Sequence, residues 1–207
     1  KSYISLQHGK HVPCSDNILK EFAGRTATPN VSENNCAMIL FTSGTTGKGK
    51  GVMLSNRNLI DNTFCTTDTA LTENEVYLNI LPIHHVFCVH SDVLVTMRDG
   101  SLLCLNRDMS KLVDHLKLFE PTAFSVVPMV AKALYNRYCL LKKQQPEKSD
   151  EEIKAEVYGR RLRKVSCGGG YLTPELAENY RDLGMSIAQG YGMSECSPVI
   201  SAADWDR

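Results

Sequence analysis

Short apolar segments alternate with helix-like segments along most of the chain. The apolar segments span residues 36–42, 76–82, 101–105 and 122–127, and the helix-like segments span residues 55–70, 110–120 and 129–141. This order is typical of βαβ units, so it predicts an α/β fold with a mainly parallel sheet flanked by helices. Because the apolar runs are continuous rather than alternating, we expect both faces of the sheet to be buried.

Polar residues before several helices predict where those helices begin. Ser110 can cap a helix that ends before Pro121, and Ser149 with Glu152 has the spacing of a capping box. Thr173 is followed by proline and glutamate, which are favoured in the first turn of a helix. These elements are therefore bounded by their own local chemistry.

The first 35 residues differ from the rest of the chain. They are mostly polar and carry two glycines and two prolines, which predicts loops or part of an incomplete lobe over residues 1–35. A chain of 207 residues with 43% hydrophobic content is long enough for one sizeable core. We therefore expect residues 36–207 to form a single α/β subdomain.

Composition narrows the possible partners and location. The 23 basic residues balance the 23 acidic ones, so no overall charge favours nucleic acid or an anionic membrane. The 8 cysteines include no CxxC pair and several lie in apolar runs, which is typical of reduced thiols packed as small core residues in a cytoplasmic protein. No apolar run approaches the roughly 18 residues of a membrane helix, so we expect no transmembrane segment.

A loop rich in glycine, hydroxyl groups and lysine follows the first apolar segment directly, in the sequence FTSGTTGKGKGV of residues 41–52. Glycines let backbone N–H groups face inward, hydroxyls donate further hydrogen bonds and lysines neutralise charge, as a polyphosphate requires. The candidate phosphate-binding residues are Thr42, Ser43, Gly44, Thr45, Thr46, Gly47, Lys48 and Lys50.

Two other interpretations of this loop have to be weighed. A flexible surface loop would explain the glycines but not the strand before them or the four hydroxyls. The phosphate loop of NTPases, G-x-x-x-x-G-K-[ST], fits the spacing from Gly44 to Lys50. However, Gly51 stands where that loop needs a Mg²⁺-binding Ser or Thr, so the mismatch falls on a residue that carries chemistry.

The loop resembles the signature of the adenylate-forming enzymes, which include acyl- and aryl-CoA synthetases, luciferases and peptide-synthetase adenylation domains. That signature ends in Gly-Lys-Pro-Lys-Gly-Val, and residues 42–52 match it except for Gly49 in the proline position. Glycine accepts the dihedral angles that proline prefers, at an entropic cost of about 1 kcal/mol. The departure should therefore loosen the loop without abolishing it.

A second segment, LPIHHVF at residues 81–87, resembles the Pro-x-x-His element of the same family. The resemblance implies that His85 orients the carboxylate to be activated and that Phe87 borders the acyl pocket. An imidazole N–H can donate to a carboxylate oxygen, which suits this role. A packed core histidine is the alternative for this residue alone, and a metal site at His84, His85 and His90 lacks supporting carboxylate or thiolate spacing.

Two later segments complete the family pattern in order. SCGGGYLTP at residues 166–174 resembles the family's adenine turn, which assigns Gly168, Gly169 and Gly170 to adenine. QGYGMSE at residues 189–195 resembles the Tyr-Gly-x-Thr/Ser-Glu signature, which places Gln189, Gly190 and Tyr191 at adenine, Ser194 at the α-phosphate and Glu195 on Mg²⁺. A single glutamate suffices because a phosphate-bridging magnesium needs only one or two protein ligands.

The resemblance covers residues 36–200 and implies a fatty-acyl-CoA synthetase-like activity. The parent enzyme would use ATP, Mg²⁺ and CoA to convert a carboxylic acid to an acyl-adenylate and then to acyl-CoA, with His85, Ser194 and Glu195 as catalytic residues. The family's C-terminal lid domain and its lysine are absent from this sequence, so we expect the piece alone to be inactive and any membrane contact to be peripheral. A phosphate-loop NTPase and a non-catalytic nucleotide-binding domain remain the alternatives.

Overall fold

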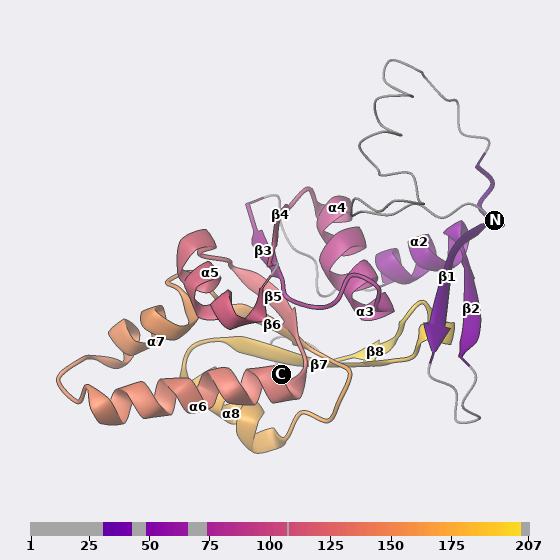
Figure 1. Ribbon diagram of the computed structural model, residues 1–207. Helices are drawn as coiled ribbons and strands as arrows, with labels where there is room; N and C mark the ends of the chain where they lie inside the picture. Colours follow the sequence, from indigo (N-terminus) through magenta and orange to yellow (C-terminus); the bar gives the residue numbers. More distant parts are fainter. Residues whose placement is uncertain (1–30, 43–48, 66–73, 107, 204–207) are drawn as a thin grey trace, which may run out of the picture. The chain divides into compact units, whose positions relative to one another are not determined.

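The computed structural model describes residues 31–42, 49–65, 74–106 and 108–203. The chain separates into two units, Lys1–Ser32 and Glu33–Arg207. The second unit contains a six-stranded sheet of order β4-β3-β5-β6-β7-β8 (Figure 1). Its strands are β3 (Val76–Asn79), β4 (Leu102–Leu105), β5 (Ala123–Val126), β6 (Lys164–Cys167), β7 (Ser186–Gly192) and β8 (Val199–Ala202).

All neighbouring strands of this sheet are parallel except β7 and β8, which are antiparallel. The helices, including 3-10 (η3, η4) and π (η2) turns, are α2 (Asn56–Cys65), α3 (Val86–Cys88), η2 (Val89–Leu94), α4 (Val95–Asp99), η3 (Met109–Lys111), α5 (Leu112–Phe119), α6 (Pro128–Gln144), α7 (Asp150–Tyr158), α8 (Pro174–Asp182) and η4 (Ser194–Cys196). The predicted α/β fold with a mainly parallel sheet is confirmed.

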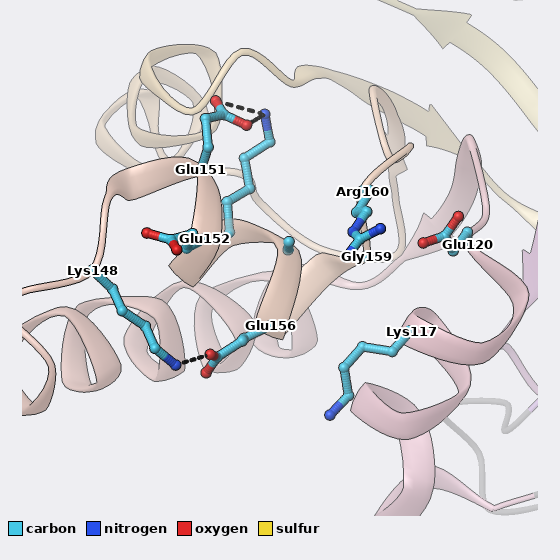
Figure 2. Close-up of a pocket in the computed structure, with 10 residues that line it drawn as sticks. Lys117, Glu120, Lys148, Glu151, Glu152, Glu156, Gly159 and Arg160 are labelled. Atoms are coloured by element: carbon cyan, nitrogen blue, oxygen red, sulfur yellow. Dashed lines mark hydrogen bonds and ion pairs between the residues drawn. The ribbon is translucent and has the colours of Figure 1, made fainter.

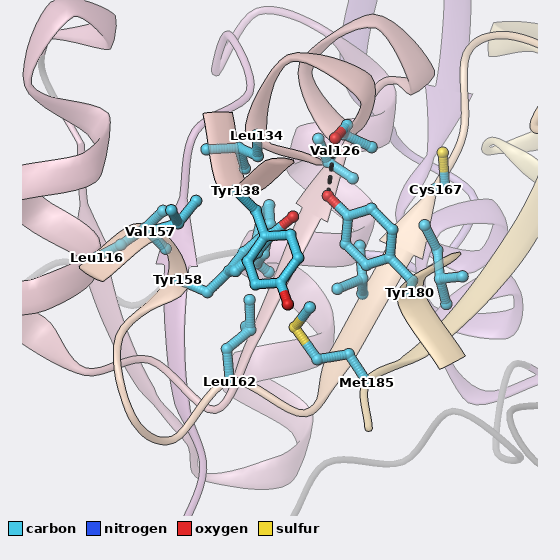
Figure 3. Packing of buried hydrophobic residues seen from close by; sticks show 14 of the residues in the cluster. Leu116, Val126, Leu134, Tyr138, Val157, Tyr158, Leu162, Cys167, Tyr180 and Met185 are labelled. Carbon is cyan, nitrogen blue, oxygen red and sulfur yellow. Dashed lines mark hydrogen bonds between the residues drawn. The ribbon is translucent and has the colours of Figure 1, made fainter. Parts of the chain in front are cut away.

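The main core lies between the sheet and the helices α5, α6, α7 and α8 (Figure 3). In this core the Tyr158 and Tyr180 rings meet edge to face with centroids 5.7 Å apart. The Tyr180 hydroxyl donates to the Ala131 carbonyl at 2.9 Å, so the buried phenol is satisfied by α6. On the opposite face of the sheet, Tyr77 and Ala123 pack with Val95 of α4. Both faces of the central strands are therefore covered, as the continuous apolar runs predicted.

One apolar run does not join this sheet. The strand β1 (Cys36–Thr42) pairs antiparallel with β2 (Lys50–Ser55) in a separate two-stranded sheet. Leu40 packs towards α2, whereas Ile39 is 54% exposed and Phe41 79% exposed. The expectation that this run is a strand buried on both faces was wrong, because a hairpin offers only one face to its neighbours.

The helix caps agree with the sequence at two of three sites. Ser149 and Glu152 form the complete capping box of α7, and the Thr173 side chain accepts from the Leu176 N–H at the start of α8. Ser110 does not cap α5. Asp108 instead accepts from the Ser110 N–H and begins a short 3-10 turn before that helix.

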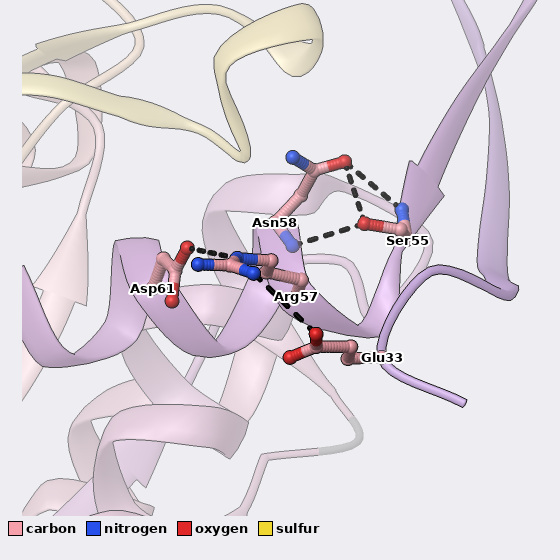
Figure 4. A network of polar contacts seen from close by, with 5 residues as sticks. All are labelled: Glu33, Ser55, Arg57, Asn58 and Asp61. Carbon is pink, nitrogen blue, oxygen red and sulfur yellow. Dashed lines mark hydrogen bonds and ion pairs between the residues drawn. The ribbon is translucent and has the colours of Figure 1, made fainter. Parts of the chain in front are cut away.

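The start of α2 is held by a polar network (Figure 4). The Asn58 N–H donates to Ser55 Oγ at 3.1 Å, and the Ser55 N–H donates to Asn58 Oδ1 at 3.1 Å. Arg57 links this turn to Glu33 and Asp61 at 3.4 and 3.3 Å. These pairs are exposed, so they contribute at most about 1 kcal/mol each and mainly fix the direction of α2.

Cysteines occupy two kinds of environment. Cys88 and Cys167 are buried, and burial raises the pKa of each thiol to about 12. Cys36, Cys65 and Cys196 are exposed. The prediction of cysteines as core residues therefore holds for only some of those that the structure describes.

Two glycines with positive φ allow a matched test of the fold. A Cβ at Gly159, where φ is +76°, would lie 2.6 Å from the Leu116 carbonyl oxygen, whereas a Cβ at Gly100, where φ is +66°, meets nothing within 4 Å. We expect Gly159→Ala to lower the free energy of unfolding by about 3 kcal/mol and Gly100→Ala by about 1 kcal/mol. Urea unfolding followed by circular dichroism measures both, and equal losses would contradict the steric explanation.

Candidate functional site

The carboxyl ends of β6 and β7 form one wall of a cavity of about 210 Å³. Because these strands are parallel and Cys167 pairs with Gln189, the segments that follow them leave the sheet at the same edge. The residues that line the cavity are His85, Val86, Phe87, Gly168, Gly169, Gly190, Tyr191, Gly192, Met193, Ser194, Pro198 and Val199. Segments 85–87, 168–169 and 190–194, distant in sequence, therefore meet in one place.

The glycine turn after β6 lets the backbone approach an aromatic ring closely. A Cβ on Gly168 would lie 2.9 Å from the Phe87 ring, so the ring rests directly on this glycine. Gln189 holds the turn in place: its Oε1 accepts from the Leu172 N–H and its Nε2 donates to the Gly170 carbonyl, both at 3.3 Å. Gln189 thus has a structural contact to the turn in addition to its position next to the cavity.

His85 lies at the cavity with a defined orientation. It is the N-cap residue of α3, and its Nδ1 accepts from the Phe87 N–H at 3.2 Å. A neutral imidazole that accepts at Nδ1 carries its proton on Nε2. The cap therefore leaves an N–H donor on the remaining ring nitrogen, which is the group needed to bind a carboxylate oxygen.

Ser194 and Glu195 lie on the short η4 turn after β7. Ser194 lines the cavity and Glu195 is exposed beside it. A Cβ on Gly192 would lie 2.0 Å from the Pro198 carbonyl oxygen, so only glycine permits the return of the chain at this point. The turn therefore presents a hydroxyl and a carboxylate next to each other at the cavity edge.

The sequence analysis did not identify Asn62, which ties this region to α2. Its Nδ2 donates to the carbonyls of Cys196 and Val199 at 3.2 and 2.8 Å, and its Oδ1 accepts from the Val199 N–H at 3.0 Å. An asparagine in an amphipathic helix carries no distinguishing pattern in sequence. Only the tertiary contact reveals that it positions the segment after Glu195.

Of the candidate phosphate loop, residues 43–48 lie outside the described residues. Thr42 and Lys50, at its two ends, face each other as the last pair of the β1–β2 hairpin. The strand β2 also contacts η4, which carries Ser194. The candidate loop therefore connects two antiparallel strands, unlike the strand–loop–helix unit of phosphate-loop NTPases.

A buried polar cluster lies behind the cavity, next to α3. Burial raises the pKa of Asp92 to about 7 and lowers the pKa of His90 to about 4. Asn79 donates to Asp92 at 2.6 Å, and His90 lies 3.4 Å from the Asn62 carbonyl. Apart from His90, named as an alternative metal site, the sequence analysis assigned no role to these residues.

A second hollow, of about 710 Å³, lies between α5 and α7 (Figure 2). Glu120 and Arg160 in its lining precede β5 and β6, so it lies at the amino-terminal edge of the sheet, opposite the first cavity. Lys148 pairs there with Glu156, and Lys154 pairs with Glu151 at 3.5 Å. Both of these lysines are thus neutralised by glutamates within the hollow. The first cavity is therefore the better candidate for the functional site.

Comparison with known proteins agrees with this arrangement. The AMP-binding enzyme family matches residues 5–207. The chain belongs to this family. It is 33% identical over 187 residues to a long-chain-fatty-acid–CoA ligase of Haemophilus influenzae, covering 84% of this chain and 30% of that protein. It is 30% identical over 192 residues to 4-coumarate–CoA ligase-like 6 of Arabidopsis thaliana, covering 88% of this chain and 32% of that protein.

Solved structures show the same fold. The o-succinylbenzoate CoA synthetase of Bacillus subtilis, in complex with ATP and magnesium, matches 92% of this chain and 37% of its own with a TM-score of 0.72 at 23% identity. The NpsA N-terminal subdomain of Klebsiella oxytoca, in complex with 3-hydroxybenzoyl-AMSN, matches 97% of this chain and 49% of its own with a TM-score of 0.74 at 20% identity. The chain thus spans about a third of the curated relatives and up to half of these structures.

The family assignment bears on several expectations. Membership among adenylate-forming acyl- and aryl-CoA ligases does not favour the phosphate-loop NTPase alternative. None of the helices in the described part of the chain is long and apolar enough to span a membrane. Among those residues, no group of three or more metal-ligating side chains is found.

Removing the Asn62 side chain tests the link between α2 and the site. We expect Asn62→Ala to lower the free energy of unfolding by about 2 kcal/mol, because two carbonyls and one N–H lose their partner. Asn62→Asp keeps the acceptor for the Val199 N–H but turns a second acceptor towards the two carbonyls, so it should be no more stable than Asn62→Ala. Denaturant unfolding measures the change, and a loss below about 0.5 kcal/mol for Asn62→Ala would show that the contact contributes little.

Proposed function

We propose that the parent protein activates a carboxylic acid with ATP, forming an acyl-adenylate and pyrophosphate, and then transfers the acyl group to CoA. The observation that supports this most strongly is the single cavity lined by His85, Phe87, Gly168, Tyr191 and Ser194, in a chain of the AMP-binding enzyme family. One face of that cavity carries the His85 N–H, which can donate to a carboxylate oxygen. The other face carries the glycine turns and the Ser194 hydroxyl.

The acid is held by the segment at the start of α3. Nε2 of His85 donates to one carboxylate oxygen, while Nδ1 remains bonded to the Phe87 N–H. The Phe87 ring, lying on Gly168, separates the acyl chain from the nucleotide. This geometry orients the second carboxylate oxygen towards the α-phosphate, so the rate gain comes mainly from positioning.

The nucleotide occupies the segments after β6 and β7. Adenine lies against the turn of Gly168, Gly169 and Gly170, next to Gly190 and the exposed ring of Tyr191. Ser194 donates to the α-phosphate at the cavity edge. The loop of residues 42–50, whose two ends face each other in the β1–β2 hairpin, binds the β- and γ-phosphates through its hydroxyls and the charges of Lys48 and Lys50.

Glu195 is the proposed ligand of magnesium. Its carboxylate is exposed next to Ser194, and one hard oxygen ligand suffices for an ion whose other ligands are phosphate oxygens and water. The bound ion would supply charge neutralisation at the transferring phosphoryl group. The arrangement of a lone carboxylate at a polyphosphate cavity fits this role.

We further propose that the acid is a fatty acid and that the reaction takes place in the cytoplasm. The apolar Val86, Phe87, Met193 and Val199 in the cavity lining favour an apolar acyl group. The relative from Haemophilus influenzae bears the name of a long-chain-fatty-acid–CoA ligase, whereas the plant relative is named after 4-coumarate.

Acid-dependent exchange of labelled pyrophosphate into ATP tests the reaction on the full-length protein. We expect exchange with fatty acids, and a fall of about 100-fold in Ser194→Ala and in Glu195→Gln because each loses a group at the reacting phosphate. Cys196→Ser, an exposed neighbour in the same turn, serves as the control and should keep full activity. Release of ADP without any acid would indicate an NTPase, and ATP binding without exchange would indicate a non-catalytic domain.

The contact between Phe87 and Gly168 allows a separate test of the acyl pocket. In Gly168→Ala the new methyl group displaces the Phe87 ring, so KM for the acid should rise about 10-fold. Gly100→Ala is the control, because a Cβ there meets nothing within 4 Å and Gly100 does not line the cavity. A rise in KM for ATP alone in Gly168→Ala would place the ring outside the acid site.

A further inference from the structure

Asn79, at the carboxyl end of β3, binds three groups at once. Its Nδ2 lies 3.0 Å from the Leu81 carbonyl oxygen, 3.1 Å from Cys88 Sγ and 2.6 Å from Asp92 Oδ2, so its two N–H donors are shared among three acceptors. Leu81 and Cys88 lie on the two sides of the segment that contains His85 and Phe87. One buried amide therefore connects both ends of the segment that lines the cavity.

Asp92 is the acceptor nearest to this amide. It is fully buried on the π-helical turn η2, and its Oδ1 has no hydrogen-bond partner among the described residues. Irregular π-turns within helices are frequent at functional sites. A buried carboxylate oxygen without a partner is costly, so Asp92 is a poor contributor to stability at this position and a role in positioning its neighbours has to be considered.

The groups that influence the pKa of Asp92 are uncharged. The groups that influence its pKa are Asn79 and Tyr77 on β3, Ser125 on β5 and Cys88 on α3. On its own turn, His90 is neutral because burial lowers its pKa to about 4. Arg98 of α4 is bound to Asp99 at 2.6 Å, and from α2 the Asn62 carbonyl faces His90.

We infer that Asn79 and Asp92 form a positioning pair that sets the Leu81–Cys88 segment, and with it the His85 imidazole and the Phe87 ring, for the bound acid. Neither residue lines the cavity, so the pair acts through the Leu81 carbonyl and Cys88. The inference rests on the proposed function for its effect on catalysis. Its effect on the segment does not depend on that function.

Burial also makes the pair sensitive to pH. Desolvation raises the pKa of Asp92 from 3.8 to about 7. Because the folded pKa lies above the unfolded one, the neutral carboxyl's contribution to stability is complete below pH 3.8 and is lost as the pH rises through about 7. Around neutral pH the buried Asp92 side chain therefore changes between the neutral carboxyl and the charged carboxylate.

Three variants of the full-length protein test the pair. Asn79→Leu removes the amide at similar volume, Asp92→Asn keeps an acceptor for Asn79 without a charge, and Tyr180→Phe is the control. The Tyr180 hydroxyl donates to the Ala131 carbonyl at 2.9 Å in the main core, so Tyr180→Phe removes a buried hydroxyl without touching Asn79 or Asp92. Each variant is compared by acid-dependent pyrophosphate exchange and by hydrogen exchange of the backbone amides of residues 81–89.

We expect Asn79→Leu to lower kcat/KM for the acid by about 100-fold, as for a misplacement of about 1 Å, with the Kd for ATP nearly unchanged. Its amides at 81–89 should exchange faster, whereas those of Tyr180→Phe should not. Asp92→Asn should keep its activity and the slow hydrogen exchange of these amides. Its pH profile should lack the inflection near pH 7 that we expect for the unmodified protein.

The outcomes separate the two proposals. If the unmodified protein shows no acid-dependent exchange, the proposed function fails, and hydrogen exchange alone decides whether the pair holds the segment. Unchanged protection of residues 81–89 in Asn79→Leu, or the same loss in Tyr180→Phe, would overturn the positioning pair. An identical pH profile in Asp92→Asn and the unmodified protein would overturn the part assigned to Asp92.

Discussion

The parallel pairing of β6 with β7 is the constraint on which the candidate site depends. Cys167, the last residue of β6, is in register with Gln189 of β7, so the glycine turn and the part of the chain leading to Ser194 start side by side. In open parallel sheets, ligands bind beyond the carboxyl ends of the strands, because the loops that follow the strands meet there and their backbone groups face the ligand. The second hollow, at the opposite edge, lacks this convergence.

A second requirement is close approach of the backbone at a few positions. Gly168 supports the Phe87 ring, and Gly192 faces the Pro198 carbonyl at a distance that excludes any Cβ. These glycines are therefore needed for the shape of the cavity as well as for chain reversal. The surrounding rigidity comes from Gln189 and Asn62, whose amides satisfy backbone groups of the two turns.

The buried polar groups of Asn79 and Asp92 make a link next to the cavity that a purely apolar core could not make. An apolar residue in place of Asn79 could fill the same space, but it could not link the Leu81 carbonyl to α3. The cost is an incompletely satisfied carboxyl at Asp92, next to the cavity rather than in the main core of α5, α6, α7 and α8. This buried polar pair thus lies next to the cavity where we propose that the acid binds.

The sequence by itself determined the α/β class and the capping box at Ser149, because strand patterns and caps are local properties. It did not determine that residues 36–42 pair with β2 in a separate hairpin, that Asp108 rather than Ser110 precedes α5, or that Asn62 and Asn79 make long-range contacts near the cavity. Those features depend on partners far away in the chain. Only the tertiary structure brings such partners within hydrogen-bonding distance, and no local pattern distinguishes these asparagines from solvated ones.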